Sequence, residues 1–208
     1  MRTYDILIIG GGCAGLSLAY HLQKNNTHHK IVILESREQY TNDKTWCFWE
    51  KNENLWTSLA TKHWVQWSFH RDSDHQTIQH QSQIWKYYYL PAIKYYEYMT
   101  KAIRTNSNIS LKMNTQVSKI TKEKVPLLSP SETVYQLETN NDTYRALQVV
   151  DTRPQKKGES LLFQSFYGCH IELQASQSDD CVALMHNMRT DHTSFRFNYI
   201  LPLSKTHI

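Results

Sequence analysis

Three glycines near the N-terminus have a spacing that could hold the phosphates of a nucleotide. Gly10, Gly12 and Gly15 form the pattern G-x-G-x-x-G, and Glu35 follows the third glycine by about 20 residues. In such a turn the first glycine permits a sharp change of direction, the second lets the backbone approach a pyrophosphate, and the third lets a helix pack closely on a strand. The carboxylate can then accept hydrogen bonds from ribose hydroxyls. Four of the six glycines lie at positions 10–15, so the pattern does not result from a glycine-rich composition.

The segments that flank the glycines are predicted to be the strands and the helix that hold the turn in place. Ile6–Ile9 and Ile31–Leu34 are short apolar runs that predict buried strands, and Leu16–Lys24 has apolar residues at helical spacing. Cys13 and Ala14 lie where the helix would begin, so its free N–H groups and partial positive charge would point at the phosphates. The agreement of strand, turn, helix, second strand and acid favours dinucleotide binding over a glycine turn that serves packing alone.

Composition excludes several other functions. The net charge of +4 in 208 residues is compatible with an anionic membrane or phosphates but does not indicate nucleic acid as a partner. The four cysteines form no C-x-x-C pair, which argues against zinc and redox motifs. His70, His75 and His80 have neither a helical nor a usual metal-ligand spacing, so we predict solvated loop histidines and no metal site.

The sequence contains no run of about 18 apolar residues, and we therefore predict no membrane-spanning helix. Asp5 and the glycines interrupt the apolar stretch at the N-terminus, which argues against an export signal. We expect a cytoplasmic protein.

The remaining chain alternates between predicted strands and few helices. Apolar spacing predicts a helix over Leu90–Arg104, with Pro91 in its first turn. Strands are predicted at Trp64–Phe69, Ile109–Met113, Thr115–Thr121, Val134–Glu138, Tyr144–Leu147, Leu161–Leu173, Cys181–Met188 and Phe195–Leu203. Lys122–Thr133 contains two prolines and two serines, so it is expected to form a loop or a hairpin insertion.

Two charged residues follow a further apolar stretch, Gln148–Val150. Asp151 and Arg153 could present their charges at the edge of a cofactor. A solvated strand end with a local ion pair is the simpler interpretation, and the sequence favours it.

All six tryptophans lie between positions 46 and 85, and six tyrosines follow between positions 87 and 98. An aromatic core and the wall of a pocket for a large apolar ligand are both compatible with this composition.

Five stretches resemble markers of the lycopene cyclase family of flavoproteins, and they occur in the family's order. They are Tyr4–Ala19, Thr45–Trp49 (T-W-C-F-W), Asp151–Pro154 (D-T-R-P), Gln164–Gly168 with His170–Glu172, and Asn198–Ser204 (N-Y-I-L-P-L-S). The glycine motif is shared by many flavoproteins, whereas the other four are more specific.

The resemblance implies closure of the ends of lycopene, or of another acyclic carotenoid, to β-rings without net redox change. It implies FAD in its reduced form as the cofactor and NAD(P)H as the reductant. Trp46, Phe48 and Trp49 become candidate substrate contacts, because carbocations in an apolar site need aromatic faces. A hydrocarbon substrate that resides in membranes also implies peripheral membrane contact.

The sequence departs from the family's pattern in two places. The family's apolar-Met-Asp-Phe stretch is replaced by Leu184–Arg189, which places no acid there. The family's acid/base carboxylate is expected beyond Ile208, in a strand that would follow the L-P-L-S marker, so no catalytic residue is assigned. We expect that these 208 residues alone do not cyclise lycopene.

The sequence thus predicts an α/β protein with a Rossmann-like, doubly wound, three-layer FAD/NAD(P)-binding domain and a mixed β-sheet substrate domain that is inserted or follows and is incomplete at the C-terminus. The expected parts are a βαβ unit at 1–45, an aromatic segment at 46–85, the continuation of the nucleotide domain at 86–155 and the start of the substrate domain at 156–208. Two alternatives remain, namely another flavin-dependent oxidoreductase of the aromatic hydroxylase or isoprenoid reductase type, and a non-catalytic nucleotide-binding fragment. The oligomeric state is not predicted.

Overall fold

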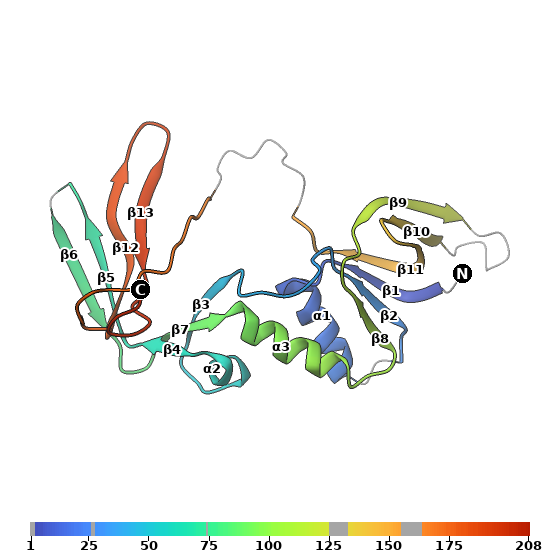
Figure 1. The fold of residues 1–208 in the computed structure, drawn as a ribbon, viewed down its shortest axis with the longest axis horizontal. Coiled ribbons are helices and arrows are strands. Elements are labelled where there is room, and N and C mark those ends of the chain that lie inside the picture. The colour runs from blue at the N-terminus through green and yellow to red at the C-terminus, as the bar shows by residue number, and fades with distance from the viewer. Residues whose placement is uncertain (1–2, 26–27, 74, 125–132, 155–163) are drawn as a thin grey trace. The chain divides into compact units, whose positions relative to one another are not determined.

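A computed structural model describes residues 3–25, 28–73, 75–124, 133–154 and 164–208 (Figure 1). The chain divides into two compact units. Unit 1 comprises Met1–Asp43 and Ile93–Ser160, and unit 2 comprises Lys44–Ala92 and Leu161–Ile208.

Unit 1 contains a six-stranded sheet and two long helices. Its sheet has the order β8-β2-β1-β11-β10-β9. The strands β8, β2, β1 and β11 are parallel, and β11, β10 and β9 form an antiparallel meander. The elements are β1 (Thr3–Ile9), α1 (Cys13–Lys24), β2 (Ile31–Leu34), α3 (Ala92–Ile103), β8 (Ile109–Lys112), β9 (Val117–Lys124), β10 (Thr133–Thr139) and β11 (Thr143–Asp151).

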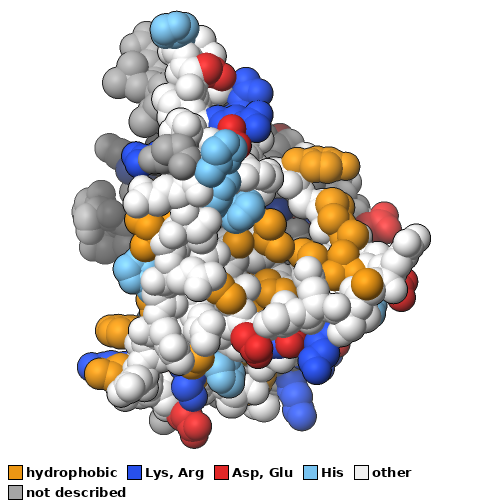
Figure 2. All heavy atoms as spheres, turned by 90° about the vertical axis from the view of Figure 1, so that its left-hand side faces the viewer, with side chains coloured by type: hydrophobic (Ala, Val, Ile, Leu, Met, Phe, Trp, Pro, Cys, Tyr) orange, Lys and Arg blue, Asp and Glu red, His pale blue; other side chains and the backbone are white. Residues whose placement is uncertain are grey.

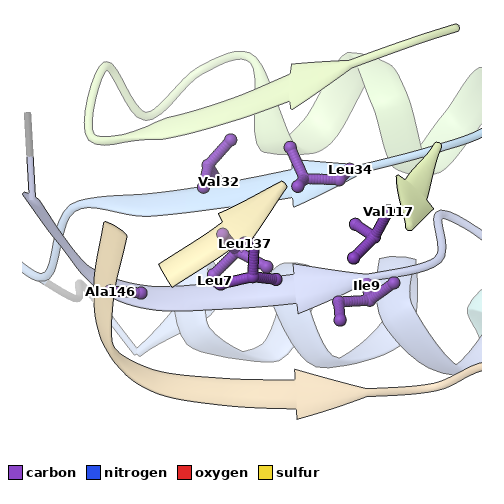
Figure 3. Packing of buried hydrophobic residues seen from close by; sticks show 7 residues of the cluster. All are labelled: Leu7, Ile9, Val32, Leu34, Val117, Leu137 and Ala146. Atoms are coloured by element: carbon purple, nitrogen blue, oxygen red, sulfur yellow. The ribbon is translucent and has the colours of Figure 1, made fainter. Parts of the chain in front are cut away.

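The core of unit 1 explains its layers. Leu7 and Ile9 of β1 pack with β2, with Ala146 of β11, and with Val117 and Leu137 of the meander (Figure 3). Successive side chains of a strand point to opposite faces, so Ile8 points the other way and lies against α1. Helices α1 and α3 lie side by side and are joined by a hydrogen bond between Ser17 and Tyr95 (2.7 Å). The predicted Rossmann-like α/β arrangement is therefore confirmed.

Unit 2 consists mainly of two sheets. One has the order β3-β7-β4 and the other has the order β13-β12-β5-β6. Its elements are β3 (Thr45–Glu50), α2 (Leu55–Leu59), β4 (Lys62–Trp64), β5 (Gln66–Arg71), β6 (Gln76–Gln81), β7 (Lys86–Pro91), β12 (Cys181–Thr190) and β13 (Phe195–Ile200). Trp64, Tyr87, Tyr89 and Val182 form a buried cluster in this unit. Hydrophobic side chains also gather on the surface shown in Figure 2, with histidines beside them.

Some secondary-structure predictions were wrong. Leu90 and Pro91 belong to strand β7 and not to the following helix, because β7 pairs along its length with β3, Leu90 opposite Trp46. Proline is tolerated there because the strand ends at this residue. For Lys122–Thr133 the hairpin alternative agrees with the structure, since Lys122–Lys124 extends β9 and pairs with antiparallel β10. The rest of that predicted loop up to residue 132 lies outside the described residues.

The strand predicted at Leu161–Leu173 is also absent from residues 164–173, and residues 161–163 lie outside the described part. Instead, the backbone near Ile171 pairs with the chain end: the N–H groups of Ile171 and Ile208 each donate to the other residue's carbonyl oxygen, at 2.9 and 3.0 Å. The strands predicted at Cys181–Met188 and Phe195–Leu203 exist as β12 and β13. Both begin at the predicted residue, and β12 ends two residues later and β13 three residues earlier than predicted.

Candidate nucleotide site

The glycine turn joins the end of β1 to the start of α1. Gly10 has a φ of +98°, a conformation that side chains disfavour. A Cβ atom at Gly15 would lie 1.9 Å from the carbonyl oxygen of Gly10, so no side chain fits between the helix and the turn. The Thr152 hydroxyl donates to the carbonyl oxygen of Ile9 (2.8 Å) and ties the turn to the end of β11.

Gly12 faces open space at the N-terminus of α1. A Cβ atom there would meet nothing within 4 Å, in contrast to Gly15. Among the described residues, no side chain caps this helix and its first turn contains no acidic residue. Cys13 and Ala14 are exposed in this turn. The first N–H groups of an uncapped helix are donors that suit an anion such as phosphate.

Glu35 follows β2 and reaches back to the glycine turn. Its side chain is almost fully buried, and Oε2 accepts a hydrogen bond from the N–H of Gly11 (2.7 Å). Burial alone would raise the pKa of Glu35, but hydrogen bonds from Arg37, the charge of Arg37 and the Gly11 N–H together lower it below its usual value. The carboxylate is therefore ionised near neutral pH and lies beside the glycine turn.

Arg37 was not predicted as a site residue. Its Nε and Nη2 donate to Oε1 and Oε2 of Glu35, both at 3.0 Å, and its Nη1 donates to Asp43 (3.1 Å). A signal did exist in the sequence, because a carboxylate that is buried after a strand needs a cationic or hydrogen-bonding partner, and Arg37 is the first basic residue after Glu35.

A cavity of about 130 Å³ opens beside the turn, at the carboxyl ends of β1 and β2. Its lining residues are Ile9, Gly10, Leu34, Ser36, Thr115, Gln116, Val117 and Arg153. Pockets for whole ligands usually measure roughly 300–1,000 Å³, so this one could hold only part of a dinucleotide. Its position at the carboxyl edge of parallel strands is where α/β proteins bind nucleotides.

Asp151 and Arg153 form the local ion pair that the sequence favoured. Arg153 donates through Nε and Nη2 to the two oxygens of Asp151, at 2.9 and 2.7 Å. Its Nη1 donates to the carbonyl oxygen of Val117 (3.1 Å), so the guanidinium also forms part of the cavity wall.

The three candidate substrate contacts lie in unit 2 on β3 and do not share one face. Trp46 and Phe48 are two residues apart in the strand, whereas Trp49 points to the opposite side. Phe48 stacks on Tyr88, with ring centroids 5.5 Å apart. Trp49 packs against Trp67 and Tyr87, with centroids 4.4 and 4.6 Å away, and is 39% exposed.

Unit 2 also contains partly buried polar contacts that the sequence did not indicate. The hydroxyl groups of Tyr87 and Tyr199 are hydrogen-bonded to each other. Cys47 lies beside them, and burial raises the pKa of its thiol although hydrogen bonds from both tyrosines lower it. Burial likewise raises the pKa of Tyr87 to about 12.

The prediction of solvated loop histidines holds for His75, which is exposed in a turn, but not for His70 and His80, which lie in strands. His70 lies on β5 and stacks on His186 of β12, with ring centroids 4.6 Å apart. Its Nδ1 is buried and has no hydrogen-bond partner among the described residues. His80 lies on β6 and stacks on Trp67. Within the described ranges, no three potential ligands are grouped so that they could hold a metal ion.

The helices of this part of the chain are also too short or too polar to cross a membrane.

Comparisons with known proteins show which family this chain resembles. The family described as Lycopene cyclase protein matches residues 5–208. The lycopene beta-cyclase of Pantoea ananas is 21% identical over 212 residues, an alignment that covers 99% of this chain and 50% of that relative. The Probable FAD-binding monooxygenase AlmA of Acinetobacter sp. is 49% identical over 39 residues, which cover 19% of this chain and 8% of that protein.

The fold has counterparts among solved structures. A geranylgeranyl bacteriochlorophyll reductase-like protein from Thermoplasma acidophilum aligns with a TM-score of 0.66 at 13% identity, over 100% of this chain and 55% of that one. This chain thus spans about half the length of the lycopene beta-cyclase and of the reductase-like protein. Since the family match extends over almost all of its residues, the chain belongs to the lycopene cyclase family.

Proposed function

We propose that this chain is the FAD-binding part of a lycopene cyclase, with the glycine turn and Glu35 as its nucleotide-binding core. The observation that carries the proposal is the open backbone at Gly12, directly before the uncapped start of α1, in a chain of this family. A relative named for FAD binding and the name of the Pantoea ananas relative support the choice of cofactor and reaction.

The described residues fit this cofactor. The N–H groups at Gly12, Cys13 and Ala14 would hold the pyrophosphate, which matches the absence of a side-chain cap in this part of the chain. Glu35 would accept hydrogen bonds from the ribose of the adenosine half. The small cavity beside Gly10 has room for a further part of that half, with Arg153 at its wall.

The proposed reaction is the closure of lycopene end groups to β-rings, without net redox change. Reduced FAD, kept so by NAD(P)H, would supply an electron-rich neighbour to the reaction. Trp46 and Phe48, which share a side of β3, offer aromatic faces that can line a hydrocarbon and stabilise a positive charge. We assign no residue of this chain to the proton transfers.

The substrate also suggests a location. A long hydrocarbon resides in membranes, so we propose peripheral contact with the cytoplasmic side of a membrane. Sedimentation of the purified protein with lipid vesicles would test this contact, and a protein that stays in the supernatant at all lipid compositions would contradict it.

The cofactor and the reaction need separate experiments. We expect purified chain to bind FAD, measured as a change in flavin fluorescence on titration, and a folded chain that leaves the fluorescence unchanged would contradict the cofactor assignment. For the reaction, the longest reading frame that contains this chain should be expressed in lycopene-producing cells, with carotenoids separated by chromatography. Cyclic carotenoid formed without stoichiometric NAD(P)H consumption is expected, and stoichiometric consumption would favour an oxidoreductase instead.

A further inference from the structure

The buried carboxylate of Glu35 receives most of its hydrogen bonds from one residue, Arg37. Three of its hydrogen bonds come from Arg37, namely from the backbone N–H (2.9 Å), Nε (3.0 Å) and Nη2 (3.0 Å). The remaining strong donor is the N–H of Gly11. Glu35 is only 4% exposed, and a carboxylate so far from water keeps its charge only with such partners.

Arg37 is itself held in one orientation. Its guanidinium makes five hydrogen bonds, as many as it has N–H donors. Besides the two to Glu35, they go to Asp43 (3.1 Å), to the hydroxyl of Tyr96 (3.0 Å) and to the carbonyl oxygen of Gly11 (3.3 Å). A planar guanidinium with all its donors engaged has little freedom to turn.

Two stacked tyrosines complete this arrangement. The rings of Tyr40 and Tyr96 lie 4.3 Å apart, and the Cζ of Arg37 lies 4.9 Å from the first centroid and 5.0 Å from the second. The hydroxyl of Tyr40 also donates to the carbonyl oxygen of Gly11 (2.9 Å). Both groups of Gly11 are thus bound: Glu35 accepts from its N–H, and Tyr40 and Arg37 donate to its carbonyl oxygen.

Gly11 lies between the two glycines of the motif that the proposed function assigns to the nucleotide. A Cβ atom at Gly11 would lie 2.5 Å from the hydroxyl of Tyr40, so the turn fits tightly against this cluster. A displacement of the Arg37 guanidinium would remove two hydrogen bonds from the carboxylate and one from the Gly11 carbonyl oxygen.

We propose that Arg37 is the positioning residue of the nucleotide site, which fixes the charged Glu35 and the Gly11 peptide in the places where ribose and pyrophosphate are received. Arg37 acts through these two groups and is not itself a ligand. The proposal rests on the proposed function for its ligand, but its effect on Glu35 can be measured without any nucleotide.

The test uses the full chain with four variants. Arg37→Gln removes the cation and its N–H donors, and Arg37→Lys keeps only the charge. The double variant, which combines Glu35→Gln with Arg37→Gln, also removes the titrating carboxyl group. Arg145→Gln is the matched control, because Arg145 belongs to unit 1 but pairs with Glu123 (3.0 Å) away from the turn. FAD affinity is measured by fluorescence between about pH 8 and about pH 5, and the Glu35 carboxyl is titrated by ¹³C NMR.

Arg37→Gln is expected to weaken FAD binding roughly 10- to 100-fold, the range for charge-assisted hydrogen bonds. Its affinity should fall further toward pH 5. Without a cation beside it, the buried Glu35 has a higher pKa than in wild type and becomes protonated within this pH range. Wild-type protein and Arg145→Gln should show no such fall. Arg37→Lys should restore the flat pH profile but not the full affinity, and the double variant should be weak and independent of pH.

Two results would overturn the proposal. Tighter FAD binding by Arg37→Gln would show that Arg37 competes with the ribose for Glu35. An NMR titration of Glu35 that is the same in Arg37→Gln and in wild type would show that Arg37 does not control the carboxylate. If the folded wild-type chain binds no FAD while the Glu35 titration does shift in Arg37→Gln, the proposed cofactor fails and the role of Arg37 is reduced to structure.

Discussion

The glycine turn of unit 1 and the aromatic cluster of unit 2 are built in opposite ways. The aromatic cluster is defined as Cys47, Trp64, Tyr87 and Tyr199. The turn depends on the absence of side chains, because at Gly15 a single Cβ atom would meet the backbone. The aromatic cluster depends on large side chains from distant segments, such as the hydroxyl pair of Tyr87 and Tyr199. A clash with backbone atoms cannot be relieved by a change of rotamer, whereas packed side chains can often shift to accommodate a substitution. The following predictions test that contrast.

The largest effect is expected at Gly15. Gly15→Val places a side chain 1.9 Å from the carbonyl oxygen of Gly10 and should prevent α1 from packing on β1, with a loss of at least about 3 kcal/mol of folding free energy. Hydrogen exchange of α1 measures this loss. Gly12→Ala is the control and should change the stability by less than about 1 kcal/mol, since its Cβ meets nothing. Equal protection of α1 in Gly15→Val and in wild type would contradict the steric account.

Glu35→Gln should have the next largest effect on the free energy of unfolding, and this effect should depend on pH. The pKa of Glu35 is lowered in the folded state, so its contribution to stability is present above the ordinary value of 4.5 and is lost as the pH falls through the lowered value. We expect Glu35→Gln to be about 2 kcal/mol less stable than wild type near pH 7, and the difference should disappear in acid. Urea unfolding at several pH values measures it, and a difference that does not depend on pH would contradict the ionised carboxylate.

The hydroxyl pair of Tyr87 and Tyr199 should give a smaller, shared effect. Each single change to phenylalanine is expected to cost about 1 kcal/mol, because it removes the hydrogen bond between the two partly buried hydroxyls. The double variant should cost less than the sum. Tryptophan fluorescence reports on this unfolding because all tryptophans belong to unit 2. Tyr167→Phe, at a side chain that is 99% exposed, is the control. Strict additivity would argue against the pair.

The smallest effect is expected for Asp151→Asn. The ion pair of Asp151 with Arg153 is half exposed, and pairs of this kind contribute about 0–1 kcal/mol. The unfolding midpoint in urea should change little, and less at high salt than at low salt. A loss as large as that of Glu35→Gln would show that the D-T-R-P stretch supports the fold of unit 1 more strongly than its exposure suggests.

The same contrast explains what the sequence could predict. The turn, α1, the first two strands and Glu35 follow from local requirements on about 35 residues, namely short apolar runs, glycines at fixed spacing and one acid. The polar contacts of unit 2 join residues far apart in the chain, Tyr87 with Tyr199 and Lys62 with Asp179, separated by 112 and 117 positions. Nothing local in a single sequence selects such partners.

Two local errors have a different origin. In T-W-C-F-W every residue after the first is apolar, so the alternation that would assign Trp46 and Trp49 to opposite sides of a strand is hidden. The helix was predicted to start too early, at Leu90. Strand β7 is buried on both sides and carries an unbroken apolar run, so its last residues also match the apolar spacing of the helix that follows. Arg37 was missed because the motif describes contacts to the nucleotide and not the partners of its own carboxylate.

The most direct test of the nucleotide site is an FAD titration of the wild-type chain beside Gly12→Val, with thermal unfolding of both. Gly12 has an extended backbone conformation that valine can adopt, and its Cβ position is open, so the variant should fold as stably as wild type within about 1 kcal/mol. Its side chain would occupy the place of the pyrophosphate, and FAD binding should weaken at least roughly 100-fold. Equal FAD affinity of the two folded proteins would contradict a nucleotide site at this turn.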